Sequence, residues 1–153
     1  MNTEIERKFL VDFDLLIAME PDMIKSGVKI EQGYIAQTEE KTVVRVRLYG
    51  DKGYLTIKGK TIGATRPEFE YEIPYEDAKE MLNKFCKKRI KKTRYIVQQS
   101  PHKWEIDIFE KENKGLIIAE IELEKEKDYF FVPKWIKEEV TYESNYFNSN
   151  LLK

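Results

Sequence analysis

Apolar and polar residues alternate one by one along eight segments of this chain. The first, residues 4–11, reads EIERKFLV, and its acids Glu4 and Glu6 share their phase with Lys8. Because successive side chains of a strand point to opposite faces, these three residues share one face of a predicted strand. The same period of two, typical of half-buried strands, recurs in residues 29–35, 43–48, 54–58, 68–73, 92–95, 104–108 and 119–124. Eight such strands predict one closed barrel or one strongly curved sheet.

Two helices are predicted between the strands, and the longer one is expected to cover the outside of the sheet. A short helical turn lies near residues 15–19 and breaks at Pro21. The longer helix follows the capping pattern Asp77-x-x-Glu80 and carries apolar residues at helical spacing as far as Cys86. No internal repeat or linker divides the chain, so we expect a single domain over residues 1–153.

The connections are predicted from glycine and proline. Residues 50–53 predict a hairpin, whereas the loop at residues 63–67 is long enough to be mobile. From Tyr129 onward we expect irregular structure, followed by a last helix near residues 146–152.

Charges on the polar strand faces are sorted by sign. Two segments carry only cations on that face and two carry only acids: Arg45 with Arg47, Lys92 with Arg94, Glu105 with Asp107, and Glu120 with Glu122. A solvated outer face is the ordinary interpretation of any one charged strand. A surface under no functional demand mixes the signs, however, and paired arginines suit a forked grip on phosphate or carboxylate oxygens. The sorted charges therefore favour polar faces that point inward and line a charged tunnel.

Composition limits the partners that we expect. Charged residues make up 36% of the chain but the net charge is only −1, so no global field attracts nucleic acid. The apolar run at residues 15–19 is too short to span a membrane, and no cationic leader precedes an apolar signal segment. The single cysteine, Cys86, excludes an internal disulfide and fits a reducing compartment. We therefore expect a cytoplasmic protein without nucleic-acid or membrane partners, and the oligomeric state, a homodimer included, stays open.

Three familiar chemistries find little support in the sequence. Gly59-Lys60-Thr61 resembles the end of a phosphate-binding loop, but the first glycine of that motif would fall at Tyr54, and no helix follows. His102 follows a Ser-Pro pair in a predicted hairpin, which favours a structural role over a Ser-His-Asp mechanism. With one histidine and one cysteine, a zinc site of the usual type is not available. Carboxylate oxygens remain, and they suit hard cations such as Mg²⁺ or Mn²⁺.

In order and spacing, the charged motifs resemble the CYTH superfamily, also called triphosphate tunnel metalloenzymes. The resemblance covers nearly the whole chain and rests on Glu4-x-Glu6-x-Lys8, Arg45-x-Arg47, Lys58, Glu68-x-Glu70, Lys92-x-Arg94-Tyr95, Glu105-x-Asp107 and Glu120-x-Glu122. It implies an α+β, mainly β fold: an eight-stranded antiparallel β-barrel, closed or nearly closed, that forms a triphosphate tunnel with helices packed outside. Members of the family hydrolyse inorganic tripolyphosphate, thiamine triphosphate or nucleoside triphosphates, and one branch cyclises ATP.

The resemblance also implies a role for each charged residue. Cations would bind the triphosphate oxygens: Lys8, Arg45, Arg47, Lys58, Lys92 and Arg94. Carboxylates would hold one or two Mg²⁺ or Mn²⁺ ions: Glu4, Glu6, Asp107, Glu120 and Glu122. Supporting acids would be Glu70 and Glu105. The catalytic group would comprise Glu4, Glu6, Lys8 and Tyr34, with Lys8 tuning the metal site or assisting proton transfer; a packed aromatic is the competing interpretation of Tyr34.

Three functions remain open. The leading one is a metal-dependent triphosphatase that cleaves the terminal phosphate of inorganic tripolyphosphate or of another small-molecule triphosphate. A class IV adenylate cyclase would use the same tunnel to form cyclic AMP and pyrophosphate from ATP. A non-catalytic module binding polyphosphate or nucleotides is the third, but such a module gains nothing from carboxylates that face its ligand. No evident adenine or thiazole contact accompanies the charged motifs, so tripolyphosphate is the expected best substrate.

Overall fold

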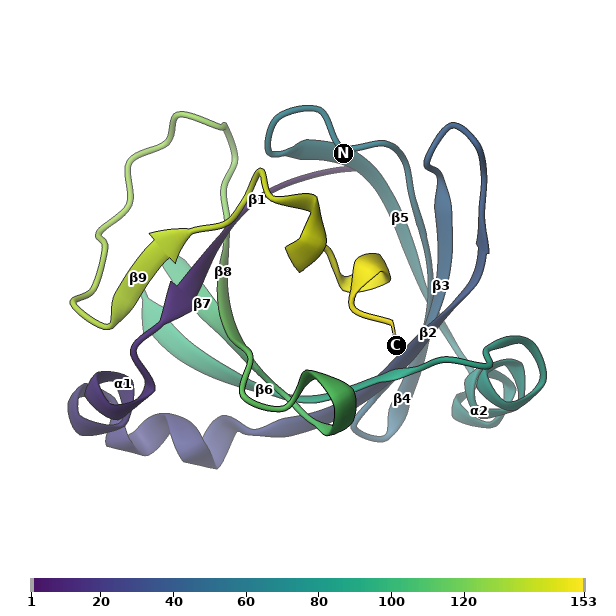
Figure 1. Ribbon diagram of the computed structural model, residues 1–153, viewed down its shortest axis with the longest axis horizontal. Coiled ribbons are helices and arrows are strands. Elements are labelled where there is room, and N and C mark those ends of the chain that lie inside the picture. Colours follow the sequence, from purple (N-terminus) through teal and green to yellow (C-terminus); the bar gives the residue numbers. More distant parts are fainter. Residues whose placement is uncertain (1, 153) are drawn as a thin grey trace.

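Within residues 2–152, the computed structural model contains nine strands and two α-helices (Figure 1). The strands are β1 (Thr3–Val11), β2 (Val28–Gln37), β3 (Val43–Tyr49), β4 (Lys52–Lys58), β5 (Thr65–Ile73), β6 (Ile90–Gln99), β7 (His102–Phe109), β8 (Ile117–Glu122) and β9 (Ile136–Glu139). The α-helices are α1 (Phe13–Met19) and α2 (Tyr75–Phe85), and the 3₁₀ helices are η1 (Pro21–Ser26), η2 (Lys111–Asn113), η3 (Ser144–Tyr146) and η4 (Asn148–Asn150). None of these helices has the length and apolar character needed to cross a membrane.

The strands form a ring because β1 pairs on both sides. The antiparallel order is β5-β4-β3-β2-β6-β7-β8-β1-β9, and β1 also pairs with β5. Residues 3–5 of β1 lie opposite residues 65–67 of β5, whereas residues 6–10 pair with β8. The double pairing joins the two ends of an eight-stranded ring, with β9 added beside β1. This confirms the predicted antiparallel, closed or nearly closed arrangement in a mainly β fold.

Two helices cover parts of the apolar outer face of the ring. Helix α2 buries Leu82 in a cluster that contains Val46 of β3. Helix α1 buries Leu16 in a second cluster around Trp104 and Trp135, whose rings pack edge to face at 5.7 Å. Figure 1 shows α1 and α2 outside the ring, at opposite sides. The predicted placement of helices outside the strands is therefore confirmed.

Part of the inner face is apolar as well. Ile90, Phe109 and Ile118 share their strand phase with the charged residues of β6, β7 and β8, so they point inward. They form a buried cluster with Leu151 of the C-terminal segment, residues 144–152. Figure 1 shows this yellow segment within the outline of the ring. An apolar plug thus fills part of the interior, and the charged faces line the rest.

Two predictions about the loops are wrong. The loop at residues 63–67 is not long: β5 begins at Thr65, and a bridge between Ile62 and Thr65 makes the turn tight. The region after Tyr129 is not wholly irregular, because β9 pairs with β1. Pro67 lies inside β5, where the sequence pattern placed it in the loop, and β9 has four residues, too few to show a period.

The helix predictions need two corrections. Helix α2 begins after Pro74, so the predicted cap Asp77 lies within the first turn. The last helix is replaced by the separate turns η3 and η4. Asparagine side chains there bond to nearby backbone, as Asn150 Nδ2 does to the Ser144 carbonyl at 2.7 Å, and such bonds compete with a regular helix.

Candidate active site

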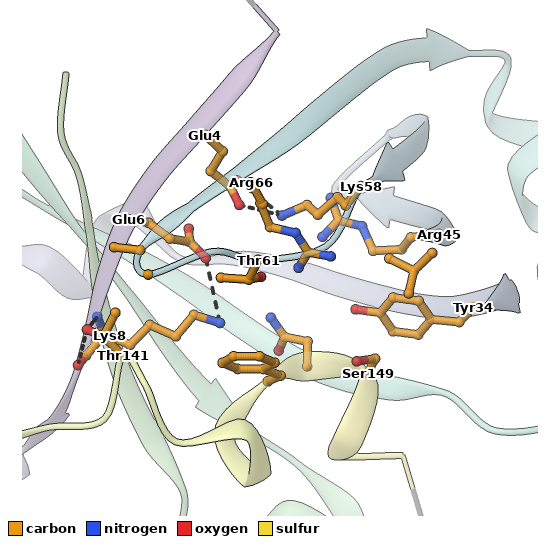
Figure 2. A pocket seen from close by; sticks show the side chains of 15 residues that line it. Glu4, Glu6, Lys8, Tyr34, Arg45, Lys58, Thr61, Arg66, Thr141 and Ser149 are labelled. Carbon is orange, nitrogen blue, oxygen red and sulfur yellow. Dashed lines mark hydrogen bonds and ion pairs between the residues drawn. The ribbon is translucent and has the colours of Figure 1, made fainter. Parts of the chain in front are cut away.

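Two adjoining cavities occupy the charged interior of the ring. We call the wider one, about 270 Å³, the chamber, and the narrower one, about 40 Å³, the recess (Figure 2 shows the recess). Both are lined by Glu4, Glu6, Arg45, Lys58 and Asn148. The chamber alone adds six residues of the predicted site: Arg47, Glu70, Arg94, Glu105, Glu120 and Glu122. The recess alone adds Lys8 and Tyr34. The structure therefore brings most of the predicted residues to one interior.

Three of the chamber's four cations, Arg45, Lys58 and Arg94, are already paired with acids. Arg45 Nη2 donates to Glu70 Oε2 at 3.2 Å. Lys58 Nζ lies 3.0 Å from Glu4 Oε1 and 3.0 Å from Glu68 Oε2. Strand pairing explains the contact between Lys58 and Glu68, which lie directly opposite each other in the β4–β5 ladder. These cations contribute binding groups whose charges are largely balanced in the empty protein.

Arg47 differs from these cations. Its Nε donates to Gln32 Oε1 at 2.8 Å, and among residues 2–152 no carboxylate oxygen lies within 4.0 Å of it. Burial, together with repulsion from Arg45 and Arg94, lowers the pKa of Arg47. The guanidinium is thus a buried positive charge without a counter-ion, a strong binding group for an anion.

Acidic faces of β1, β7 and β8 lie next to one another. Glu6 of β1 is directly opposite Glu122 of β8, and Glu120 of β8 is directly opposite Glu105 of β7. Like charges in opposed positions destabilise a sheet. Burial and repulsion by Glu6 raise the pKa of Glu120, burial and neighbouring acids raise the pKa of Glu122, and burial raises the pKa of Glu4 to about 6. The acid cluster therefore holds negative charge that Lys8 and Lys58 balance only in part.

Asp107 and Lys92 line neither cavity. Asp107 Oδ1 accepts from Arg94 Nε at 2.7 Å, and Oδ2 accepts from Lys92 Nζ at 2.6 Å and from Arg94 Nη2 at 2.9 Å. Burial alone would raise the pKa of Asp107, but the charges of Arg94 and Lys92 outweigh it and hold that pKa well below its usual range. Both oxygens of Asp107 are engaged, so this carboxylate faces its own cations and not the chamber.

Lys8 lies between two acids of the site. Its Nζ is 3.6 Å from Glu6 Oε1 and 3.9 Å from Glu120 Oε1. Burial alone would lower the pKa of Lys8, but Glu120 and Glu6 outweigh it and raise that pKa. The backbone N–H of Lys8 donates to Thr141 Oγ1 at 2.9 Å, which anchors this part of β1 beside the segment that follows β9 (Figure 2).

The acid cluster suits a hard divalent cation by its donor chemistry. Glu4, Glu6, Glu120 and Glu122 all line the chamber and offer only oxygen ligands, which Mg²⁺ and Mn²⁺ prefer. A cation among these carboxylates would relieve the repulsion that raises their pKa values. Within residues 2–152, no three or more acid, imidazole or thiol groups are gathered closely enough to hold a metal ion. The carboxylates therefore have the ligand atoms that such an ion prefers, and their side chains would have to move closer to one another to bind it.

The cavities include residues outside the predicted set of site residues. Thr61, Arg66, Phe147 and Ser149 line the recess, and Asn148 lines both cavities. Arg66 left a signal, because it shares its phase with the acids of β5 that follow it. Asn148 belongs, with Tyr146, to a tail that resembles the short bacterial members of the family, but Phe147 and Ser149 left no signal, since a stretch of short turns has no period to detect.

Comparisons with known proteins agree with this architecture. The model of the CYTH domain family matches residues 2–152. An inorganic triphosphatase of Acetivibrio thermocellus is 47% identical over 154 residues, which cover 100% of this chain and 95% of that protein. An inorganic triphosphatase of Nitrosomonas europaea is 32% identical, with 97% of this chain and 96% of that protein covered.

A solved structure leads to the same family. The crystal structure of an inorganic triphosphatase superposes with a TM-score of 0.63 at 27% identity, covering 99% of this chain and 95% of that one. The ring of antiparallel strands, its inward charges and the full-length family match together place the chain: it belongs to the CYTH domain family.

Proposed function

We propose that this chain is a divalent-metal-dependent triphosphatase that cleaves the terminal phosphate of inorganic tripolyphosphate. The observation that carries the proposal is the sorting of charge around one chamber, with cations on β3, β4 and β6 and acids on β7, β8, β1 and β5. A phosphate chain would neutralise the charge of the cations, and a bound metal cation would neutralise the charge of the acids. The two relatives named inorganic triphosphatases, at 47% and 32% identity, support the same activity in this chain.

The chain's cations would bind and orient the phosphate groups. Arg47 would gain the most from binding an anion, because its buried charge has only the neutral Gln32 as a partner. Arg45, Lys58 and Arg94 would exchange or share their present carboxylate partners with phosphate oxygens. Phosphoryl transfer needs little covalent chemistry from the protein, so positioning and charge stabilisation supply most of the catalysis.

Four carboxylates would hold the metal: Glu4, Glu6, Glu120 and Glu122. A bound Mg²⁺ or Mn²⁺ would supply further neutralisation of charge on the phosphate oxygens. Glu70 and Glu105 keep their supporting role, since each is a counter-ion of a substrate-binding arginine.

Lys8 would stabilise charge on the phosphate that is transferred. Its ammonium group has three N–H donors and no acceptor, and it lies between Glu6 and Glu120 at the edge of the recess. Water would attack the terminal phosphorus as the bond to the bridging oxygen breaks; pyrophosphate would leave, and a proton of the water would pass to a phosphate oxygen or to solvent. No side chain in this scheme forms a bond to phosphorus. Tyr34 lines the recess across from Lys8 and would complete its wall (Figure 2).

Asp107 and Lys92 take a different part from the one that the resemblance implies. Because Asp107 binds Arg94 through two parallel contacts, we assign it the positioning of that guanidinium, not metal binding. Lys92, whose side chain is 0% exposed, serves as its second buried partner and does not reach the chamber.

The first prediction is the choice of reaction. Purified protein with Mg²⁺ should convert tripolyphosphate to orthophosphate and pyrophosphate, and should hydrolyse ATP more slowly, because the site offers contacts to phosphate and metal but none evident to a base. Product analysis by ion chromatography with ATP, thiamine triphosphate and tripolyphosphate checks this. Cyclic AMP and pyrophosphate as the main products from ATP, formed faster than tripolyphosphate is cleaved, would overturn the proposal.

The second prediction concerns the metal. Glu120→Gln and Glu122→Gln should lower turnover and raise the Mg²⁺ concentration for half-maximal activity by at least about tenfold, since even outer partners of a metal site cost that much affinity. The matched control is Glu80→Gln on α2, whose carboxylate pairs with Lys84 on the surface. EDTA should abolish wild-type activity. Full activity of both chamber variants at limiting Mg²⁺ would show that these acids are not ligands.

The third prediction separates the acids by their effect on stability. Asp107→Asn should lower the free energy of unfolding by about 3–5 kcal/mol, because it leaves two buried cations without their shared counter-ion. Glu122→Gln should leave stability unchanged or increase it, since it removes a charge that its neighbours repel. Chemical denaturation of the metal-free proteins measures both. Equal losses in the two variants would contradict the different roles assigned to them.

A further inference from the structure

One cation of the recess differs from the others. Four cations line this cavity: Lys8, Arg45, Lys58 and Arg66. Each of the first three has a carboxylate oxygen within 4.0 Å. The partners of Lys8 are on β1 and β8, and the partner of Arg45 is on β5. The partners of Lys58 are on β1 and β5. In the described part of the chain, Arg66 has no carboxylate oxygen within that distance. Its charge is the unbalanced one in the recess.

The backbone fixes where that charge points. Arg66 lies opposite Glu4 in the β1–β5 pairing, and its Nε donates to the Gly59 carbonyl at 3.0 Å. This contact uses the inner nitrogen of the guanidinium and leaves its two terminal nitrogens for another partner. Figure 2 shows the side chain reaching into the recess. A forked cation held in this way is suited to two parallel bonds with a phosphate group.

The turn that precedes Arg66 is anchored by hydrogen bonds to a residue between β8 and β9. Glu126, in the connection between β8 and β9, accepts from the Ala64 N–H at 2.6 Å and from Thr65 Oγ1 at 3.2 Å. Gly63 has a φ of +64°, a conformation that favours glycine, and an added Cβ there would lie 2.5 Å from Glu126 Oε1 and displace that carboxylate from the contact. Arg66 therefore lies in β5 directly after a tight, anchored turn, and its backbone needs little further ordering when an anion binds.

The recess has room for more than one ordered water and is lined by groups that bind phosphate oxygens. Its volume of about 40 Å³ exceeds the roughly 10–15 Å³ that one ordered water requires. The hydroxyl groups of Thr61 and Ser149 line it beside the cations. Glu4, Glu6, Arg45 and Lys58 are shared with the chamber, so a chain of phosphates bound in the chamber can extend into the recess.

We propose that Arg66 binds the phosphate group at the recess end of a triphosphate, and that this contact lets the protein distinguish a triphosphate from a diphosphate. The inference rests on the proposed function, because it assigns a subsite of the same tunnel. A diphosphate would fill the chamber and leave Arg66 without its ligand. The third phosphate of a longer chain would gain the contact with the guanidinium, so a triphosphate would bind more tightly than a diphosphate.

Equilibrium binding tests this without turnover. Isothermal titration calorimetry with Mg²⁺ compares two probes that cannot be hydrolysed, methylene-bridged tripolyphosphate and methylenediphosphonate. The variants are Arg66→Met, which keeps the stem and removes the charge, and Arg66→Lys, which keeps the charge without the fork. The control is Arg89→Met, because Arg89 is paired with Glu31 and Asn83 outside the ring.

Wild type should bind the triphosphate analogue more tightly than the diphosphonate. Arg66→Met should weaken binding of the triphosphate analogue by about tenfold or more, the loss expected for one charged hydrogen bond, and leave binding of the diphosphonate unchanged. Arg66→Lys should fall between the two, and Arg89→Met should match wild type. Retained diphosphonate binding also shows that the Arg66→Met protein is folded.

Two results would overturn the inference: Arg66→Met weakens both probes equally, or it weakens neither. The proposed function fails separately, if wild type binds the triphosphate analogue but releases no orthophosphate from tripolyphosphate.

Discussion

The carboxylate of Asp107 holds two cations that are buried inside the ring, and the charged interior depends on this contact. Lys92 is 0% exposed and Arg94 is 8% exposed in their side chains, and both bond to the same carboxylate. Buried charges are tolerated only where pairing and hydrogen bonds offset their desolvation. Lys92 also lies 5.3 Å from the ring of Phe109, which belongs to the apolar plug. The Asp107 contact therefore marks the boundary between the packed part of the interior and the part available to ligands.

On the ligand side of that boundary, the charges are left incompletely balanced. Arg47 has a neutral amide as its partner, and Glu6 lies opposite Glu122. Both arrangements cost stability in the empty protein, and both are relieved by a ligand that carries phosphate oxygens together with a divalent cation. Fixed charges in a secluded site act more strongly than they do in water and need little reorganisation when substrate binds. The fold thus gives up some stability at the positions where it would bind and stabilise the reacting phosphate.

The strand faces could be predicted from the sequence, whereas depth along the tunnel could not. A period of two places Glu105 and Asp107 on the same inward face, and both do point inward. Their surroundings differ because Asp107 lies two residues further along β7, next to the plug residue Phe109 on the same face, whereas Glu105 lines the chamber, and no periodicity encodes depth along a strand. The sequence pattern does not predict Arg66 as a site residue, because Pro67 indicates a loop at this position, although both residues lie in β5. The position of Asn148 in the interior follows from tertiary packing of the C-terminal segment, which has no local pattern.

The most direct test of the account is the melting temperature of the protein with Mg²⁺ alone, with tripolyphosphate alone, and with both. Any ligand that binds the folded chain and not the unfolded one raises the melting temperature. The inward cations are expected to bind a phosphate chain and the inward acids a metal ion. The two ligands together should then raise the melting temperature by more than the sum of their separate effects, because each neutralises charge that the other does not reach. An unchanged melting temperature with both ligands at saturating concentration would contradict a phosphate- and metal-binding interior.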